Sequence, residues 1–130
     1  MKKLLPVLFV GLLLSCGKLA ATQELDVVGS WHGQSRSQVQ PGATLEWSLE
    51  LVGSRCSGEV RGYRGYFAFE GTWAMSEGAV LCKARFTVGT GDVQGNALTL
   101  TLTPIGQELR GTWYSELLKR SDPISFKRAK

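Results

Sequence analysis

Few side chains in this 130-residue chain have the types and spacing of a catalytic site. His32, the one histidine, follows Trp31, so on a strand it faces away from the interior. No G-x-S-x-G sequence accompanies it to mark the nucleophile of a Ser-His-Asp relay. Glu59 and Glu70 could meet across a hairpin as a glycosidase-type pair, but no carboxylate pair is singled out. We therefore predict no catalytic residues and a protein that is not an enzyme.

The sequence offers little that would hold a metal ion or a cofactor. Cys56 and Cys82 lack both a C-x-x-C spacing and a nearby histidine, which makes them a poor metal site. The glycine-rich stretch 89–95 resembles a phosphate cradle only superficially, because no helix follows it to supply N-terminal amides. We predict a long hairpin loop there, and no metal and no cofactor.

One segment carries residue types that are enriched at binding surfaces. Residues 61–66 contain two arginines and two tyrosines in a turn that glycines permit. One interpretation is a plain hairpin turn with solvated arginines. The other is a rim that contacts a ligand, a glycan or a partner protein. That rim would comprise Arg61, Tyr63, Arg64 and Tyr66.

The N-terminus has the parts of a bacterial export signal. Lys2 and Lys3 precede an apolar run at 4–14, which is too short to span a bilayer. The run ends in Leu13-Leu14-Ser15-Cys16, which resembles the lipobox of bacterial lipoproteins. The alternative is an ordinary secretory signal with a chance cysteine.

The lipobox resemblance implies three segments. Residues 1–15 would be the signal peptide, 16–25 the lipidated Cys16 with its tether, and 26–130 a β-barrel domain. Two or more acyl chains anchor a protein stably in a membrane. Gly17 follows the cysteine where an Asp would suggest retention in the inner membrane, so an outer membrane anchor facing the periplasm is favoured.

The charge balance argues against nucleic acid as a partner. The chain has 15 Lys and Arg against 11 Asp and Glu, and two of the lysines lie in the predicted signal peptide. The small basic excess that is left does not indicate a strongly acidic partner.

An oxidising compartment would make Cys56 and Cys82 a candidate disulfide. In a simple meander one strand separates them, and alternate strands lie ~9.5 Å apart. A disulfide needs its Cα atoms within about 7 Å, so we expect Cys56 to lie in a loop that leans over the intervening strand. The alternative is an undistorted meander with both cysteines as small core residues.

Alternation of apolar and polar residues with period two dominates the remaining chain. Eight short strands with one apolar face each must curl to close their edges. We predict an all-β fold, a small antiparallel up-and-down barrel or a flattened sandwich. The strands are expected at 28–34, 45–51, 56–61, 67–75, 80–88, 98–102, 109–113 and 124–126.

The first strand carries Gly29-Ser30-Trp31, and Gly-x-Trp recurs at Gly71 and Gly111. A first-strand Gly-x-Trp, an up-and-down meander and a basic residue near the end of the last strand are together similar to the calycins, which include lipocalins and avidins. This resemblance implies that Arg128 packs across Trp31 and closes the barrel.

The calycin resemblance also implies a function. It would be a non-enzymatic binding module for a small apolar ligand or lipid, anchored in the membrane. Many bulky residues are predicted to face inward, so the interior is expected to be largely filled. The alternative is therefore a periplasmic protein–protein interaction module, or an enzyme inhibitor, that uses the barrel loops.

Overall fold

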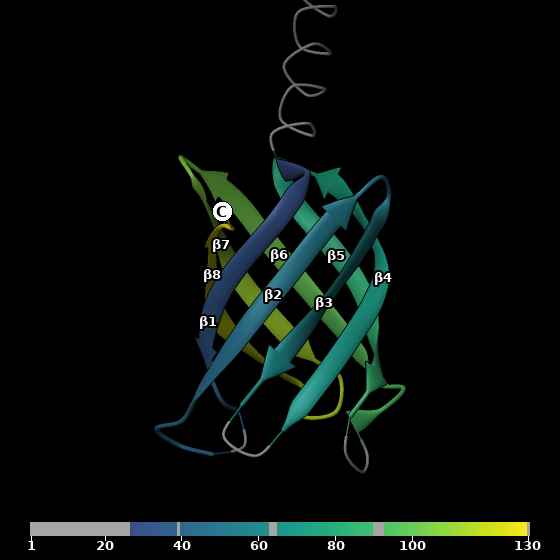
Figure 1. The fold of residues 1–130 in the computed structure, drawn as a ribbon, viewed down its shortest axis with the longest axis vertical. Helices are drawn as coiled ribbons and strands as arrows, with labels where there is room; N and C mark the ends of the chain where they lie inside the picture. The colour runs from purple at the N-terminus through teal and green to yellow at the C-terminus, as the bar shows by residue number, and fades with distance from the viewer. Residues whose placement is uncertain (1–26, 39, 63–64, 90–92, 130) are drawn as a thin grey trace, which may run out of the picture.

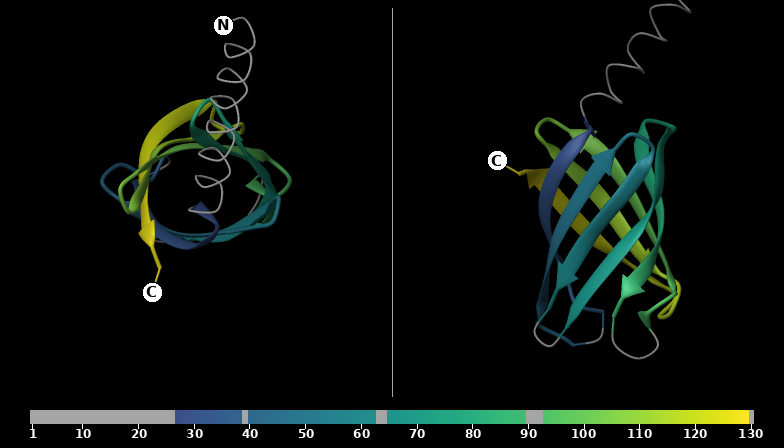
Figure 2. Two further views of the ribbon diagram at one scale, coloured as in Figure 1. Left: turned by 90° about the horizontal axis from the view of Figure 1, so that it is seen from above. Right: turned by 45° about the vertical axis from the view of Figure 1, so that its right-hand side comes forward.

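The computed structural model describes residues 27–38, 40–62, 65–89 and 93–129 as one closed barrel of eight antiparallel strands (Figure 1). Each strand pairs with its neighbours in sequence, and β1 pairs with β8 to close the ring, which is visible from above in Figure 2. The prediction of an all-β, antiparallel up-and-down barrel is confirmed. The strands are β1 (Gly29–Arg36), β2 (Thr44–Val52), β3 (Arg55–Arg61), β4 (Tyr66–Ser76), β5 (Ala79–Val88), β6 (Ala97–Ile105), β7 (Glu108–Ser115) and β8 (Arg120–Arg128).

The core follows directly from the period-two pattern. On β6, three leucines face inward and are fully buried, while the threonines between them face outward. All four tryptophans of the chain are buried in the same core. The core of the barrel therefore consists of the inward-facing apolar side chains that the period-two alternation predicts.

The two ends of the barrel differ in their connections. Two-residue turns join β2 to β3, β4 to β5 and β6 to β7 at one end, here called the turn end. Glu77 and Gly78 both have positive φ, the backbone of a tight hairpin turn whose twist matches its strands. Longer connections join the strands at the opposite end, here called the loop end. β1 begins and β8 ends at the turn end (Figure 1).

Trp31 and Arg128 lie together at the turn end. The Arg128 guanidinium carbon lies 4.2 Å from the centroid of the Trp31 ring, and Arg128 Nη1 donates a hydrogen bond to the Val28 carbonyl oxygen at 2.7 Å. The Trp31 indole N–H donates to the Val27 carbonyl oxygen at 2.9 Å. These contacts join the start of β1 to the end of β8.

The expected disulfide and its leaning loop are wrong, because Cys56 and Cys82 are both free, buried thiols. Cys56 lies within β3, paired with Gly71 of β4. The curvature of the barrel brings some Cα atoms of β3 and β5 within 8 Å of each other. This is closer than the ~9.5 Å expected for alternate strands of a flat sheet. The two thiols meet across β4 and form a hydrogen bond. The meander is undistorted, with both cysteines as small core residues.

Two strands extend beyond their predicted ranges, 98–102 and 124–126, and include a proline. Pro123 lies inside β8 and Pro104 inside β6. At these positions each strand is paired on one side only: β1 pairs with β8 from Ile124 onward, and β5 pairs with β6 only up to Leu102. A proline is tolerated there because its missing N–H is not needed by a second neighbour.

The predicted signal peptide, Cys16 and the tether at 16–25 lie outside the described residues. Among the residues that the structure does describe, no helix is long and apolar enough to cross a membrane.

Candidate functional site

A cavity of about 340 Å³ opens at the loop end of the barrel. Its inner walls are large apolar side chains from β2, β3, β4, β5 and β7. Its rim comes from the connections between strands, including Gln38, Val93, Leu117 and Leu118. The inner walls are formed by Leu45, Trp47, Val60, Phe67, Phe86 and Trp113.

Packed aromatic rings form the floor of the cavity. The Trp47 ring lies 5.1 Å from the Trp113 ring and 6.3 Å from the Phe126 ring, centroid to centroid, with steep angles between the planes. The Trp47 indole N–H donates to Ser35 Oγ at 2.8 Å, which fixes the orientation of the ring. The middle of the barrel is thus filled, as the bulky inward residues predict, and the cavity lies on the loop-end side of these rings. A second, more polar cavity of about 260 Å³ lies at the turn end, beside Trp31, Pro104 and Arg128.

The polar groups of the lining are few and uncharged. No described residue that lines the cavity is Asp, Glu, Lys, Arg or His. The Gln38 side chain donates from Nε2 to the Arg120 carbonyl oxygen at 3.0 Å, so its Oε1 faces the other way. Among the described residues, Gln38 Oε1 and the indole N–H of Trp113 are buried without a hydrogen-bond partner. Such groups are rare in proteins, and each calls for a physical explanation.

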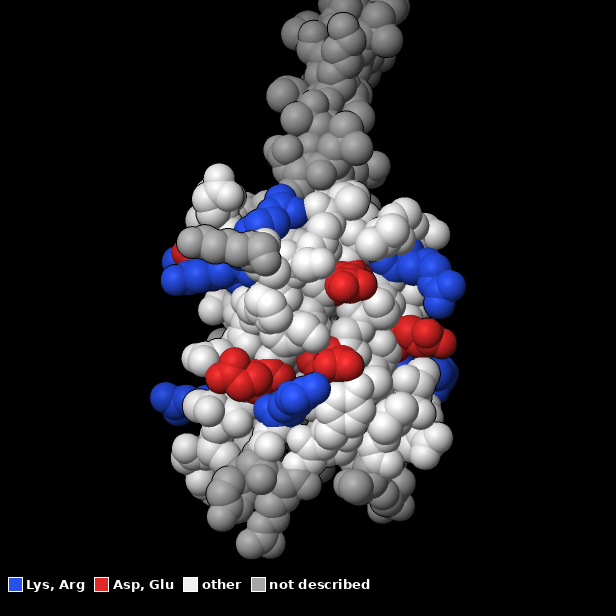
Figure 3. All heavy atoms as spheres, in the orientation of Figure 1, with Lys and Arg blue, Asp and Glu red and all other residues white. Residues whose placement is uncertain are grey.

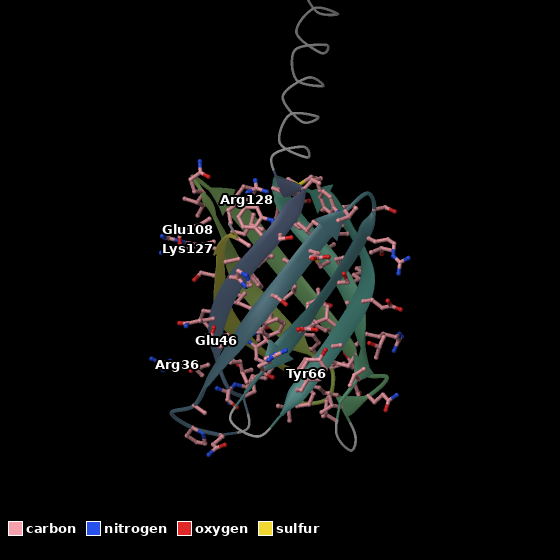
Figure 4. The ribbon with its side chains drawn as sticks, viewed as in Figure 1. Arg36, Glu46, Tyr66, Glu108, Lys127 and Arg128 are labelled. Carbon is pink, nitrogen blue, oxygen red and sulfur yellow. The ribbon has the colours of Figure 1, made fainter. Side chains whose placement is uncertain are left out.

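The predicted binding rim lies beside the mouth of this cavity. Arg61 and Tyr66 face each other across the end of the β3–β4 hairpin, with the guanidinium carbon 5.5 Å from the ring centroid. The Tyr66 hydroxyl donates to Glu59 Oε1 at 2.7 Å, and this hydrogen bond raises the pKa of Tyr66. Both side chains lie on the outer surface of the wall, where Figure 4 labels Tyr66. Tyr63 and Arg64 lie outside the described residues.

The structure does not bring the candidate catalytic residues together. His32 is exposed on the outer face of β1. Glu59 is occupied by Tyr66, whereas Glu70 forms an ion pair with Arg55 at 3.5 Å. In the described part of the chain, no group of three or more His, Cys, Asp or Glu side chains could hold a metal ion.

Sequence reasoning missed the rim residues Gln38, Leu117 and Leu118. The sequence did contain one indication for the two leucines, because they are adjacent apolar residues in the short connection between β7 and β8, where no strand buries them. They are 41% and 43% exposed, yet both line the cavity. An apolar pair in an otherwise polar turn is typical of the edge of a binding site.

Together, the fold and the cavity define a small closed β-barrel with an apolar site at one end, an architecture compatible with a calycin-like barrel. No family model, curated protein or solved structure matches the chain.

Proposed function

We propose that this protein is a calycin-like bacterial lipoprotein that binds a small apolar ligand or lipid in the loop-end cavity and catalyses no reaction. The observation that carries the proposal is the cavity itself. Its volume of about 340 Å³ is within the range of small-molecule sites, and its inner walls are apolar and largely aromatic. The half-exposed Leu117 and Leu118 at its mouth would extend the apolar surface along which a ligand enters.

A lipid anchor at Cys16 is compatible with this site. Val27, the first described residue, packs at the turn end, opposite to the cavity mouth. An anchored barrel would therefore carry its membrane attachment and its ligand entrance at opposite ends, where neither obstructs the other.

Replacement of Cys16 tests the anchor. Cys16→Ser should leave the signal peptide uncleaved by the lipoprotein pathway and should abolish incorporation of labelled palmitate. If the variant still incorporates palmitate, or still reaches the membrane as a mature-sized band, the anchor assignment is wrong.

A fluorescent, uncharged probe tests the binding site. N-phenyl-1-naphthylamine should bind the purified protein and accept energy from its tryptophans, two of which line the cavity. Ala43 also lines the mouth, and the backbone of its loop is held by a hydrogen bond from Ser37 N to the Ala43 carbonyl oxygen at 2.9 Å. Ala43→Trp should therefore fill the mouth without disturbing the fold, and should weaken binding at least ~10-fold.

The matched control places the same bulk on the outer wall. Thr103 is exposed on β6, so Thr103→Trp should leave probe binding unchanged. Absence of binding to the folded wild-type protein would contradict the proposed function. So would equal affinity in the two tryptophan variants.

The second candidate function, an interaction or inhibitor module, is favoured by the same exposed leucine pair. Loops that carry apolar side chains on a rigid barrel could dock into another protein. In that case, Leu117→Ser with Leu118→Ser would abolish capture of a specific periplasmic protein, and Ala43→Trp would leave capture intact.

A further inference from the structure

We propose that the loop-end cavity selects uncharged, ring-containing molecules and discriminates against anionic lipids such as fatty acids. This inference rests on the proposed function, because it names the class of ligand for the same site. Three features of the cavity support it: the charge of its lining, the arrangement of its rings and the nature of its unpaired polar atoms.

The lining has no positive group that would pair with an anion. All of the described residues that line the cavity are neutral. Of the described basic residues at this end, Arg61 pairs with Glu59 at 3.7 Å, and Arg85 donates to the Gly95 carbonyl oxygen at 3.0 Å. Arg120 pairs with Asp122 at 3.2 Å, while Lys119 is exposed to solvent and does not line the cavity. Figure 4 shows Arg36 projecting away from the barrel. A carboxylate or sulfonate inside the cavity would therefore lose its hydration without gaining a partner, which is strongly unfavourable.

The face of the barrel seen in Figure 3 does not carry a surface charge of one sign that would concentrate anions. Acidic and basic side chains are interspersed over the face of the wall shown in Figure 3. Arginines of β3, β7 and β8 form ion pairs with acidic residues that lie on the same strand or on the adjacent strand. No single-sign field on that face would steer a charged ligand to the mouth.

The walls present rings in a tilted arrangement. Phe67 and Phe86 lie 6.1 Å apart at an interplanar angle of 67°, and Trp47 and Trp113 lie 5.1 Å apart at 65°. Such surfaces offer both ring faces and ring edges, so a flat aromatic ligand finds offset-stacked and edge-to-face contacts. At protein packing density the volume holds on the order of 15 non-hydrogen atoms, the size of a two- or three-ring molecule.

The two unpaired polar atoms are neutral as well. The Trp113 N–H is a donor and Gln38 Oε1 is an acceptor, and both belong to residues that line the cavity. Both atoms are covered in the structure, so a hydroxyl or carbonyl group on a ring would complement them once the side chains rotate to expose them. Neither atom needs an ionised partner.

A matched pair of probes tests the selectivity. N-phenyl-1-naphthylamine and 8-anilino-1-naphthalenesulfonate share one ring skeleton and differ by the sulfonate. The full chain in lipid nanodiscs is titrated with each probe, energy transfer from tryptophan is measured, and empty nanodiscs are the blank. We expect the uncharged probe to bind at least ~10-fold more tightly. Equal binding, or preference for the sulfonate, would overturn the inference and leave the proposed function standing. Binding of neither probe would overturn both.

A charge at the rim should change the preference in a defined direction. Leu118→Lys places a cation on a residue that is 43% exposed and lines the mouth. It should increase sulfonate affinity by about fivefold and change the affinity for the uncharged probe little. Ile105→Lys is the control, because Ile105 is 50% exposed at the turn end. An unchanged preference in Leu118→Lys, or the same change in both variants, would refute the assignment.

Discussion

The contact between Trp31 and Arg128 predicts a specific loss of stability when Arg128 is replaced by alanine. Arg128→Ala removes a guanidinium 4.2 Å from the Trp31 ring centroid and a charged hydrogen bond of 2.7 Å to the Val28 carbonyl oxygen. At an exposed site the first interaction contributes ~0.5–1 kcal/mol, and the second about 1–2 kcal/mol. The free energy of unfolding should therefore fall by roughly 2 kcal/mol, which for a domain of this size lowers Tm by about 10 °C.

The neighbouring residue supplies the control for this prediction. Lys127 is exposed on β8, and its side chain points to the opposite side of the strand from Arg128. Lys127→Ala should change the free energy of unfolding by less than ~0.5 kcal/mol. Urea denaturation followed by tryptophan fluorescence measures both variants.

A double-mutant cycle decides whether the ring contact itself contributes. Trp31→Ala should cost ~3–5 kcal/mol, because a buried ring is deleted. Combined with Arg128→Ala, it should give a coupling energy of at least about 0.5 kcal/mol. A coupling of zero, or equal stability in Arg128→Ala and Lys127→Ala, would show that the guanidinium does not stabilise the closure.

Three further predictions concern the core. Gly111→Ala should lower the free energy of unfolding, measured by urea denaturation, by ~2–3 kcal/mol, because a Cβ at this position would collide with the backbone of β6. Wild-type stability of this variant would refute the prediction. Trp47→Phe should lower the free energy of unfolding by ~1 kcal/mol more than Trp113→Phe in the same assay, because the Trp47 indole donates a hydrogen bond and the Trp113 indole does not. Equal losses in the two variants would contradict this. Cys56 and Cys82 should resist alkylation in the native protein, because both side chains are fully buried, although their mutual hydrogen bond raises the pKa of Cys82 and lowers that of Cys56. Both should react after denaturation without reductant, and protection that persists would indicate a disulfide.

The strands could be predicted wherever apolar residues on the inner face of the barrel wall alternate with polar residues on its outer face. Leu98, Leu100 and Leu102 alternate with threonines, and β6 follows this pattern. The prediction failed at Pro104 and Pro123, where the wall is paired on one side only and a residue normally found in turns is accepted. The alternation of a single strand does not show where its neighbours end, so such positions cannot be identified from the sequence.

The recurring Gly-x-Trp sequence has a physical basis that supports its interpretation as a packing feature. Gly71 and Gly111 both face the barrel interior, and a Cβ on either would collide with the backbone of an adjacent strand. The tryptophan two residues later, Trp73 or Trp113, is buried on the same side. Absence of a side chain at one position thus lets the strands approach closely while a large ring fills the space beside them. The contact between the two cysteines across β4 could not be foreseen from the spacing of flat strands.

The cavity could not be predicted by counting bulky residues, because its origin lies in the small ones. Toward the loop end, the inward positions of β1 and β7 carry Ser35 and Ser115, which are buried. On this side of the barrel no large ring follows Trp113, whereas Phe67 and Phe86 form the opposite wall of the cavity. The Ser35 hydroxyl accepts a hydrogen bond from the Trp47 indole and donates one to the Arg36 carbonyl oxygen, so it orients the ring at the floor without filling the space above it. The cavity therefore forms where inward side chains become small and the connections become long, and Trp113, whose indole N–H has no hydrogen-bond partner, is one of the residues that line it. A cavity that results from small inward residues on several strands can be recognised only when the register of all eight strands is known.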